Sequence, residues 1–274
     1  MKKLIVVADW AADTLSCQEV RTTVEGYLKD HNGGKITFIQ STPSTIHTAF
    51  LVSQVVEVEE RYGKPLETVI FQNTDPRLQA DHALKNAEGA KPLIIRLKSG
   101  IYLLGPNAGY NFSLIKNRIE ETFEYKGLNS EDQFHSRDLY SRISAHLMDE
   151  MEDELELEEI SSAIILPLIG HYVAHIGSFG NIKMLIPHSY FKGKFEYGDL
   201  VSITINGTTQ KAKYVTNLFG GEPGELVIYP GSSGKLDDRF LEVSIWRHFT
   251  EKNPTTGMHV FNNPRPGMEI EIKK

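Results

Sequence analysis

The sequence changes its pattern near Pro167, and this change constrains the fold more than any other feature. Before it, apolar runs rich in β-branched residues, at 4–8, 36–39 and 68–71, alternate with segments of helical periodicity. Strands that alternate with helices in this way are typical of a wound, mainly parallel sheet. The first part of the chain is therefore predicted to be an α/β domain.

Helical periodicity marks four segments of this first part. Apolar residues fall at helical spacing in 20–28 and in 45–61, between the predicted strands. Two later segments, 114–121 and 139–159, are also expected to be helical. The last of them contains an acidic run, which is typical of a solvated helix face and indicates no chemistry.

The remaining strands are of two kinds. Runs at 93–97 and 101–104 flank a Lys-Ser-Gly turn and predict a hairpin, which would make the first sheet mixed. After Pro167, short strands separated by Gly, Pro and Asn turns are typical of a small barrel or sandwich. They are expected at 172–176, 181–186, 200–205, 210–214, 225–229 and 241–245. We therefore expect an α/β domain at 1–163 and an all-β, barrel-like domain at 164–274.

Composition and charge disfavour several classes of protein. A formal net charge of -7 is unsuited to binding a nucleic-acid backbone, which depends on clustered Lys and Arg. Cys17 is the only cysteine, so a disulfide within one chain and a cysteine-based zinc site are excluded. The sequence has no apolar stretch of the roughly 18 residues that a membrane span needs, and its opening run is typical of a strand rather than a signal peptide. We expect a cytoplasmic protein with no nucleic-acid or membrane partner.

Polar residues stand directly after three of the predicted strands. They lie at 9–13, 73–75 and 106–109. In open α/β sheets, ligands bind beyond the carboxyl ends of the strands. The sequence therefore predicts that these three segments contribute to a ligand site.

Together with 134–138 and 175–181, these segments resemble the family of S-adenosylmethionine hydroxide adenosyltransferases and halogenases, the fluorinase-chlorinase family, as in a divergent member. Asp9 and Trp10 match the family's opening Asp-aromatic-Gly turn, with Ala11 where Gly is usual. The resemblance implies that Asp9 holds the ribose diol, because a carboxylate can accept hydrogen bonds from both hydroxyls. Without the resemblance, Asp9 would be interpreted as the cap of the following helix.

The resemblance also implies a reaction centre. Asp75 matches the Asp of the family's Asp-Pro-Gly segment, and His135 lies in a segment similar to Phe-His-Gly-Arg-Asp. In the hydroxide-transferring members these two work with an Arg seven residues after the Asp. That position is His82 here, and Arg77 lies nearby, so both are candidates for the cation. On its own, His135 would be interpreted as a helix cap or a surface residue.

The clearest match lies in the second domain. Phe179 and Asn181 correspond to the family's Asp-x-Phe-Gly-Asn turn, whose Phe and Asn contact adenine. Gly177 replaces the Asp that contacts the methionine ammonium, which implies an affinity about tenfold to a hundredfold lower. Three further matches complete the substrate-binding set: Asn107, Ser232 and Ser233.

The resemblance implies a hydrolase that converts S-adenosylmethionine to adenosine and methionine by substitution at the ribose C5'. It also implies a homotrimer with sites at subunit interfaces, and neither a cofactor nor a metal is expected. The alternative is a homologue that binds a nucleoside or S-adenosylmethionine without catalysis or with an altered substrate, which the changes at Gly177 and at the arginine position favour. A halogenase fits less well, because His135 belongs to the hydrolytic pattern.

Overall fold

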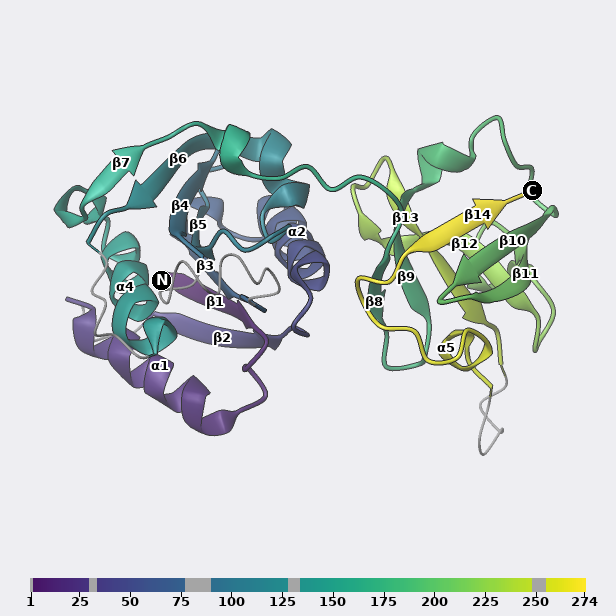
Figure 1. Ribbon diagram of the computed structural model, residues 1–274, viewed down its shortest axis with the longest axis horizontal. Helices are drawn as coiled ribbons and strands as arrows, with labels where there is room; N and C mark the ends of the chain where they lie inside the picture. Colours follow the sequence, from purple (N-terminus) through teal and green to yellow (C-terminus); the bar gives the residue numbers. More distant parts are fainter. Residues whose placement is uncertain (1, 30–33, 77–89, 128–133, 248–254) are drawn as a thin grey trace. The chain divides into compact units, whose positions relative to one another are not determined.

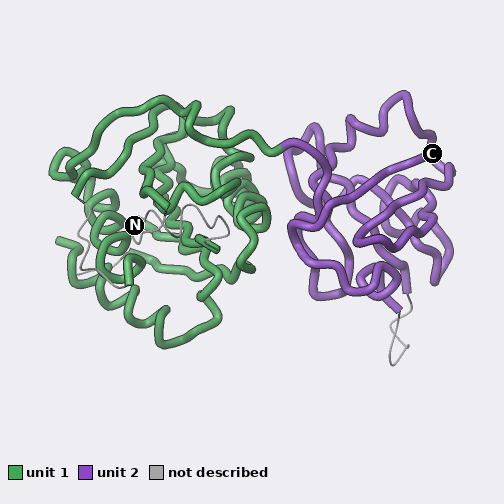
Figure 2. Tube along the Cα trace, viewed as in Figure 1, with its two compact units in different colours: residues 1–168 green, residues 169–274 purple. Residues whose placement is uncertain are grey.

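The computed structural model describes residues 2–29, 34–76, 90–127, 134–247 and 255–274. The chain divides into two compact units, residues 1–168 and residues 169–274 (Figure 2). A seven-stranded mixed sheet forms the centre of each unit. The long helices belong to the first unit, so the chain has an α/β fold.

The first unit contains all the predicted strands of the α/β part and the helices predicted at 20–28 and 45–61. Its strands and α-helices are β1 (Lys3–Ala8), α1 (Thr14–Tyr27), β2 (Lys35–Gln40), α2 (Thr45–Tyr62), β3 (Thr68–Asn73), β4 (Pro92–Leu97), β5 (Tyr102–Pro106), β6 (Ile119–Tyr125), α4 (Ser141–Met148) and β7 (Leu157–Glu159). Short helical turns complete it: η1 (Pro65–Glu67), η2 (Ser113–Arg118), the π-helical η3 (Ser136–Tyr140), η4 (Glu152–Glu154) and η5 (Ser162–Ile164).

The first sheet is mixed, as the predicted hairpin implied, and it is not mainly parallel. Its strand order is β2-β1-β3-β5-β4-β6-β7. The strands β2, β1, β3 and β5 pair in parallel, whereas β4 is antiparallel to β5 and β6, and β7 is antiparallel to β6. The predicted hairpin between β4 and β5 is confirmed, and Gly100 in its turn has a φ of 88°, which glycine adopts readily.

Helices cover both faces of this sheet (Figure 1). Along β1, Leu4 and Val6 pack with α1 and α4, whereas Ile5 and Val7 pack with α2. Because successive side chains of a strand point to opposite faces, a strand covered on both sides needs apolar residues at every position. This explains the continuous apolar run at 4–8.

The helix predicted at 114–121 is wrong in its second half. The 3-10 helix η2 ends at Arg118, and β6 follows it and pairs with β4. The outer edge of β4 offers backbone hydrogen-bonding groups that a buried sheet must satisfy. Pairing with β4 therefore overrides the local helical pattern.

The helix predicted over 139–159 is too long. The α-helix α4 ends at Met148, and Glu150 has a φ of 58°, outside the helical range. The acidic run would place several negative charges at the carboxyl end of the helix, where the helix dipole disfavours them. The chain instead forms the short turn η4 and the strand β7.

The second unit is a curled antiparallel-rich sheet. Its elements are β8 (Val173–Ile176), β9 (Ile182–Pro187), η6 (His188–Phe191), β10 (Leu200–Ile205), β11 (Thr208–Tyr214), η7 (Leu218–Gly220), β12 (Leu226–Gly234), β13 (Arg239–Ile245), α5 (Gly257–Val260) and β14 (Ile270–Lys273). All six predicted strands are confirmed. Tyr172 and Glu269, which directly precede β8 and β14, form an isolated bridge, and the Val173 N–H donates to the Met268 carbonyl at 2.8 Å. Sequence analysis missed β14.

In the part of the chain that the structure describes, no helix is both long enough and apolar enough to cross a membrane.

Candidate functional site

The carboxyl ends of β1 and β3 lie side by side. At this pair of strands, successive connections of the chain run to opposite sides of β1. Starting from β1, the chain passes through α1 to β2 on one side and then through α2 to β3 on the other. Such a switch point is where open α/β sheets bind ligands. Ala8 pairs with Asn73 at the ends of the two strands, so Asp9 and Asp75 follow neighbouring strand ends. Asn107 follows β5, the next strand of the sheet.

Two carboxylates interact at this switch point. The Asp9 backbone N–H donates to the Asn73 carbonyl at 3.3 Å, which joins the two turns. Burial raises the pKa of the Asp9 carboxyl, the charge of Asp75 raises it further, and nearby backbone N–H groups only partly oppose this. A half-buried carboxylate in such a place is stabilised by a ligand that donates hydrogen bonds.

Asp9→Asn is expected to raise the melting temperature at neutral pH. The raised pKa means that ionised Asp9 destabilises the folded state above that pKa, and this cost disappears as the pH falls through it. The gain of the variant should therefore shrink in acid, which thermal unfolding at several pH values would detect. As a matched control, Asp13→Asn should lower the melting temperature, because hydrogen bonds from Ser16 and Leu15 lower the pKa of Asp13. Loss of stability at neutral pH in Asp9→Asn would contradict the prediction.

A chain of buried hydroxyls supports the turn that carries Asp75. Ser41, Thr48 and Thr74 are almost completely buried, and their hydroxyls are linked in that order by two hydrogen bonds of 2.7 Å. The Asn111 amide donates to the Thr74 carbonyl at 2.8 Å. Sequence analysis missed these residues, because single polar residues within apolar segments give no local signal. Only their burial shows that they fix the end of β3.

The segment containing His135 is connected to the same end of the sheet. The Asn73 side-chain amide donates to the Ser136 hydroxyl in η3, directly after His135. Burial and the charge of Asp75 raise the pKa of the Tyr140 phenol at the other end of η3. Segments of π-helix occur frequently at functional sites. His135 precedes this turn without capping it through its side chain.

The remaining residues predicted for this site are Asp75, Arg77, His82 and Asn107. Asp75 accepts a hydrogen bond from the Ala90 N–H at 2.9 Å. Arg77 and His82 lie outside the described residues. Asn107 donates its backbone N–H to the Lys91 carbonyl at 2.9 Å.

Trp10 packs into the aromatic edge of the first core. Its ring lies 5.8 Å from Phe134 and 6.3 Å from Phe38, between ring centroids. The Trp10 indole nitrogen is buried and has no hydrogen-bond partner among the residues that are described. The cap of α1 is Asp13, whose carboxylate accepts from the Leu15 N–H at 3.1 Å. Helix capping therefore does not explain Asp9.

In the second unit, four side chains form a row across adjacent strands. Strand register pairs His175 with Lys183, Lys183 with Glu242, and Glu242 with Tyr229. Their sequence neighbours Ile182, Met184, Leu241 and Val243 belong to the core of this unit. The row therefore lies on the opposite, outward face of the curled sheet.

Glu242 is the centre of this row. It is only 6% exposed, and its Oε1 accepts hydrogen bonds from the Asn181 amide at 2.5 Å and from the Tyr229 hydroxyl at 3.0 Å. Its Oε2 accepts from the Lys183 ammonium at 3.0 Å. Lys183 also donates to the Ser232 hydroxyl at 2.8 Å. The row thus connects Asn181 and Ser232, two of the predicted substrate-binding residues.

The Gly177 position is coupled to Asn181. A Cβ atom at Gly177 would lie 2.1 Å from the Asn181 Oδ1, so a side chain there would require the Asn181 side chain to shift. Phe179, in the same turn, is 72% exposed, and its ring lies 5.8 Å from the Arg247 guanidinium carbon. Ser233 is buried, and its hydroxyl has no partner in the described part of the chain.

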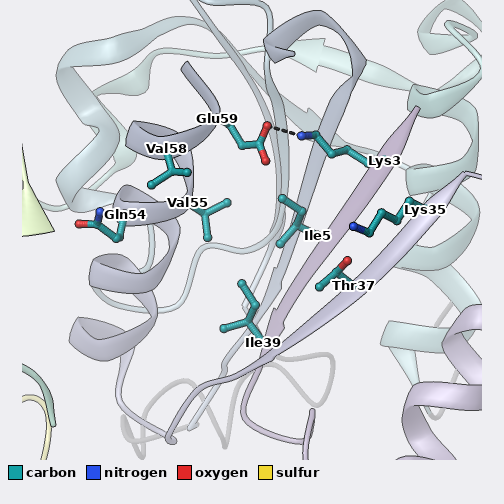
Figure 3. A pocket seen from close by; sticks show the side chains of 9 residues that line it. All are labelled: Lys3, Ile5, Lys35, Thr37, Ile39, Gln54, Val55, Val58 and Glu59. Carbon is teal, nitrogen blue, oxygen red and sulfur yellow. Dashed lines mark ion pairs between the residues drawn. The ribbon is translucent and has the colours of Figure 1, made fainter. Parts of the chain in front are cut away.

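The first unit also has a cavity away from the predicted site residues. A cavity of about 350 Å³ lies between α2 and the strands β1 and β2, and its lining includes Lys3, Lys35 and Glu59 but none of the predicted site residues (Figure 3). Across the residues with described positions, no cluster of three or more His, Cys, Asp or Glu side chains could hold a metal ion.

No family model matches the chain. A protein of Methanocaldococcus jannaschii named (R)-S-adenosyl-L-methionine hydrolase is 28% identical to it over 162 residues, which are 56% of this chain. The match spans 58% of that relative's length. The similarity to this hydrolase therefore covers only part of each chain.

Two solved structures share the fold over the whole chain. An uncharacterized conserved protein from Thermotoga maritima has a TM-score of 0.73 and 19% identity, covering 99% of this chain and 100% of its own. A conserved hypothetical protein from Thermus thermophilus has a TM-score of 0.65 and 16% identity, covering 100% of both chains. The chain therefore has the fold of these two proteins and a partial sequence similarity to an S-adenosylmethionine hydrolase.

Proposed function

We propose that this chain is an S-adenosylmethionine hydroxide adenosyltransferase, which releases adenosine and methionine by substitution at the ribose C5'. The observation that carries the proposal is the pair of interacting carboxylates, Asp9 and Asp75, at the switch point of the first sheet. The partial similarity to a protein named as such a hydrolase supports the same reaction.

The chemistry requires positioning more than acid catalysis. A sulfonium leaves as a neutral thioether, so the leaving group needs no proton. The protein must orient the ribose, desolvate the attacking water and accept its proton. We assign the ribose diol to Asp9 and the water to Asp75 and His135. Arg77 and His82 are the candidates to stabilise the developing hydroxide-like charge.

The second unit supplies the proposed contacts to the base and the amino-acid part. The exposed ring of Phe179 is available to stack on adenine. The Asn181 amide is oriented by Glu242, because a carboxylate only accepts hydrogen bonds. The Asn181 Oδ1 therefore remains as an acceptor for a ligand. Ser232, Ser233, Trp10 and Asn107 complete the proposed substrate-binding set.

A second function is favoured by the Gly177 position. Gly177 stands where the family has its ammonium-binding Asp, so that carboxylate is missing. A protein that binds a nucleoside without cleaving S-adenosylmethionine, or that acts on an altered substrate, would not need it.

The test is incubation of the purified protein with S-adenosylmethionine, with adenosine and methionine followed by chromatography. Adenosine formed by the parent protein and lost in both Asp75→Asn and His135→Ala would establish hydrolysis and exclude a contaminating enzyme. No product, together with calorimetric binding of adenosine, would favour the non-catalytic alternative. Failure to bind any nucleoside would remove both functions.

The homotrimer is part of the proposal. Light scattering after size exclusion is expected to give a mass three times the 30.9 kDa of the chain. Dilution that dissociates the trimer should also abolish turnover, because the family resemblance implies sites at subunit interfaces. A monomer with full activity would contradict this assembly.

A further inference from the structure

Lys183 has a hydrogen-bond donor that the protein does not use. Its ammonium group carries three N–H bonds. Glu242 accepts one at 3.0 Å and Ser232 accepts another at 2.8 Å. Among the residues described in the structure, no other group accepts from it. The Lys183 side chain is 17% exposed, so its remaining N–H can reach a bound ligand.

The contact with Lys183 also determines which hydrogen bonds the Ser232 hydroxyl can make. The Ser232 oxygen accepts from the ammonium, so its own O–H must be donated elsewhere. Ser232 is exposed, and within the described ranges its hydroxyl donates to no protein group. A charged N–H and an O–H therefore lie next to each other on the outward face of the sheet. Two adjacent donors of this kind suit a carboxylate.

The remaining members of the row do not compete for the same ligand. Glu242 is buried and already accepts three hydrogen bonds, so it is not available to a ligand cation. Burial and the neighbouring Lys183 charge lower the pKa of His175, and the charge of Glu242 only partly opposes this. Lys183 is thus the cation of this row, and Glu242 holds it in place.

We propose that Lys183 and Ser232 bind the carboxylate of the amino-acid part of the substrate and thereby determine its specificity. The inference rests on the proposed function, since it assumes that the ligand is a nucleoside with an amino-acid side chain. It adds a substrate preference: because Gly177 offers no carboxylate to the ammonium, the site selects the substrate by its carboxylate rather than by its amino group.

The experiment compares four non-reactive ligands by calorimetry: adenosine, S-adenosylhomocysteine, and the forms of S-adenosylhomocysteine that lack the carboxyl group or the amino group. We expect loss of the carboxyl group to weaken binding about tenfold or more, as for a charge-assisted hydrogen bond. Loss of the amino group should change the affinity much less. Equal binding with and without the carboxyl group would overturn the inference and leave the proposed function standing.

Two variants test the assignment to Lys183 without leaving the buried carboxylate of Glu242 unpaired. Glu242→Gln keeps an acceptor for Asn181 and releases Lys183 from its ion pair, so the preference for the carboxylate should persist. Lys183→Met combined with Glu242→Gln should abolish it, with adenosine binding to the same double variant as the reference. A preference that survives in the double variant would overturn the inference. A protein that binds none of the ligands would overturn the proposed function and this inference with it.

Discussion

Asp75→Asn is expected to lower the rate of S-adenosylmethionine cleavage by about 10²–10⁴-fold, the usual contribution of a positioned acid-base group. Asn has the same shape and can still accept a hydrogen bond from the Ala90 N–H, so the turn after β3 should keep its structure. The Asn side chain cannot take up the proton of the attacking water. Single-turnover measurements of adenosine formation at saturating substrate would report this step directly.

The effect of Asp75→Asn on substrate binding should be small. Removing the Asp75 charge removes one of the causes that raise the pKa of Asp9, so Asp9 should ionise at lower pH and bind the diol at least as well. Asp9→Asn is the matched control, because it is expected to weaken substrate binding more than it slows the chemical step. Unchanged turnover in Asp75→Asn would show that this carboxylate takes no part in the reaction.

Local patterns were sufficient for most of the fold. The strands β1 and β3 are covered on both faces, and this burial requires the continuous apolar runs by which they were predicted. The strands β6 and β7 were missed, because their acidic, alternating sequences become strands only by pairing next to β4. The short β14 alternates Ile with charged residues and is likewise defined by its partner β10.

The candidate site was predictable only in part. Asp9 and Asp75 were found because they follow predicted strands, and the order β2-β1-β3 places those strand ends together. Lys183 and Glu242 were not found as a pair. In sequence they lie in different strands of alternating pattern, where an outward charge usually faces water. Their contact depends on the register between β9 and β13, which no local pattern specifies.

Lys183→Met is expected to lower the free energy of unfolding by about 3–5 kcal/mol, as when one partner of a buried ion pair is removed. The Glu242 side chain is 8% exposed, so its charge would remain buried with only Asn181 and Tyr229 as donors. Urea unfolding at neutral pH would measure the loss. A loss below about 1 kcal/mol would mean that water reaches the pair, as at a surface ion pair.

Adding Glu242→Gln to Lys183→Met should recover most of this stability, because a buried ion pair replaced by neutral groups often costs little. Gln still accepts a hydrogen bond from the Asn181 amide or from the Tyr229 hydroxyl. If the double variant is stable but no longer distinguishes ligands by their carboxyl group, the pair is needed for recognition rather than for folding. If it is as unstable as Lys183→Met, the loss comes from the missing lysine side chain and not from the unpaired charge of Glu242.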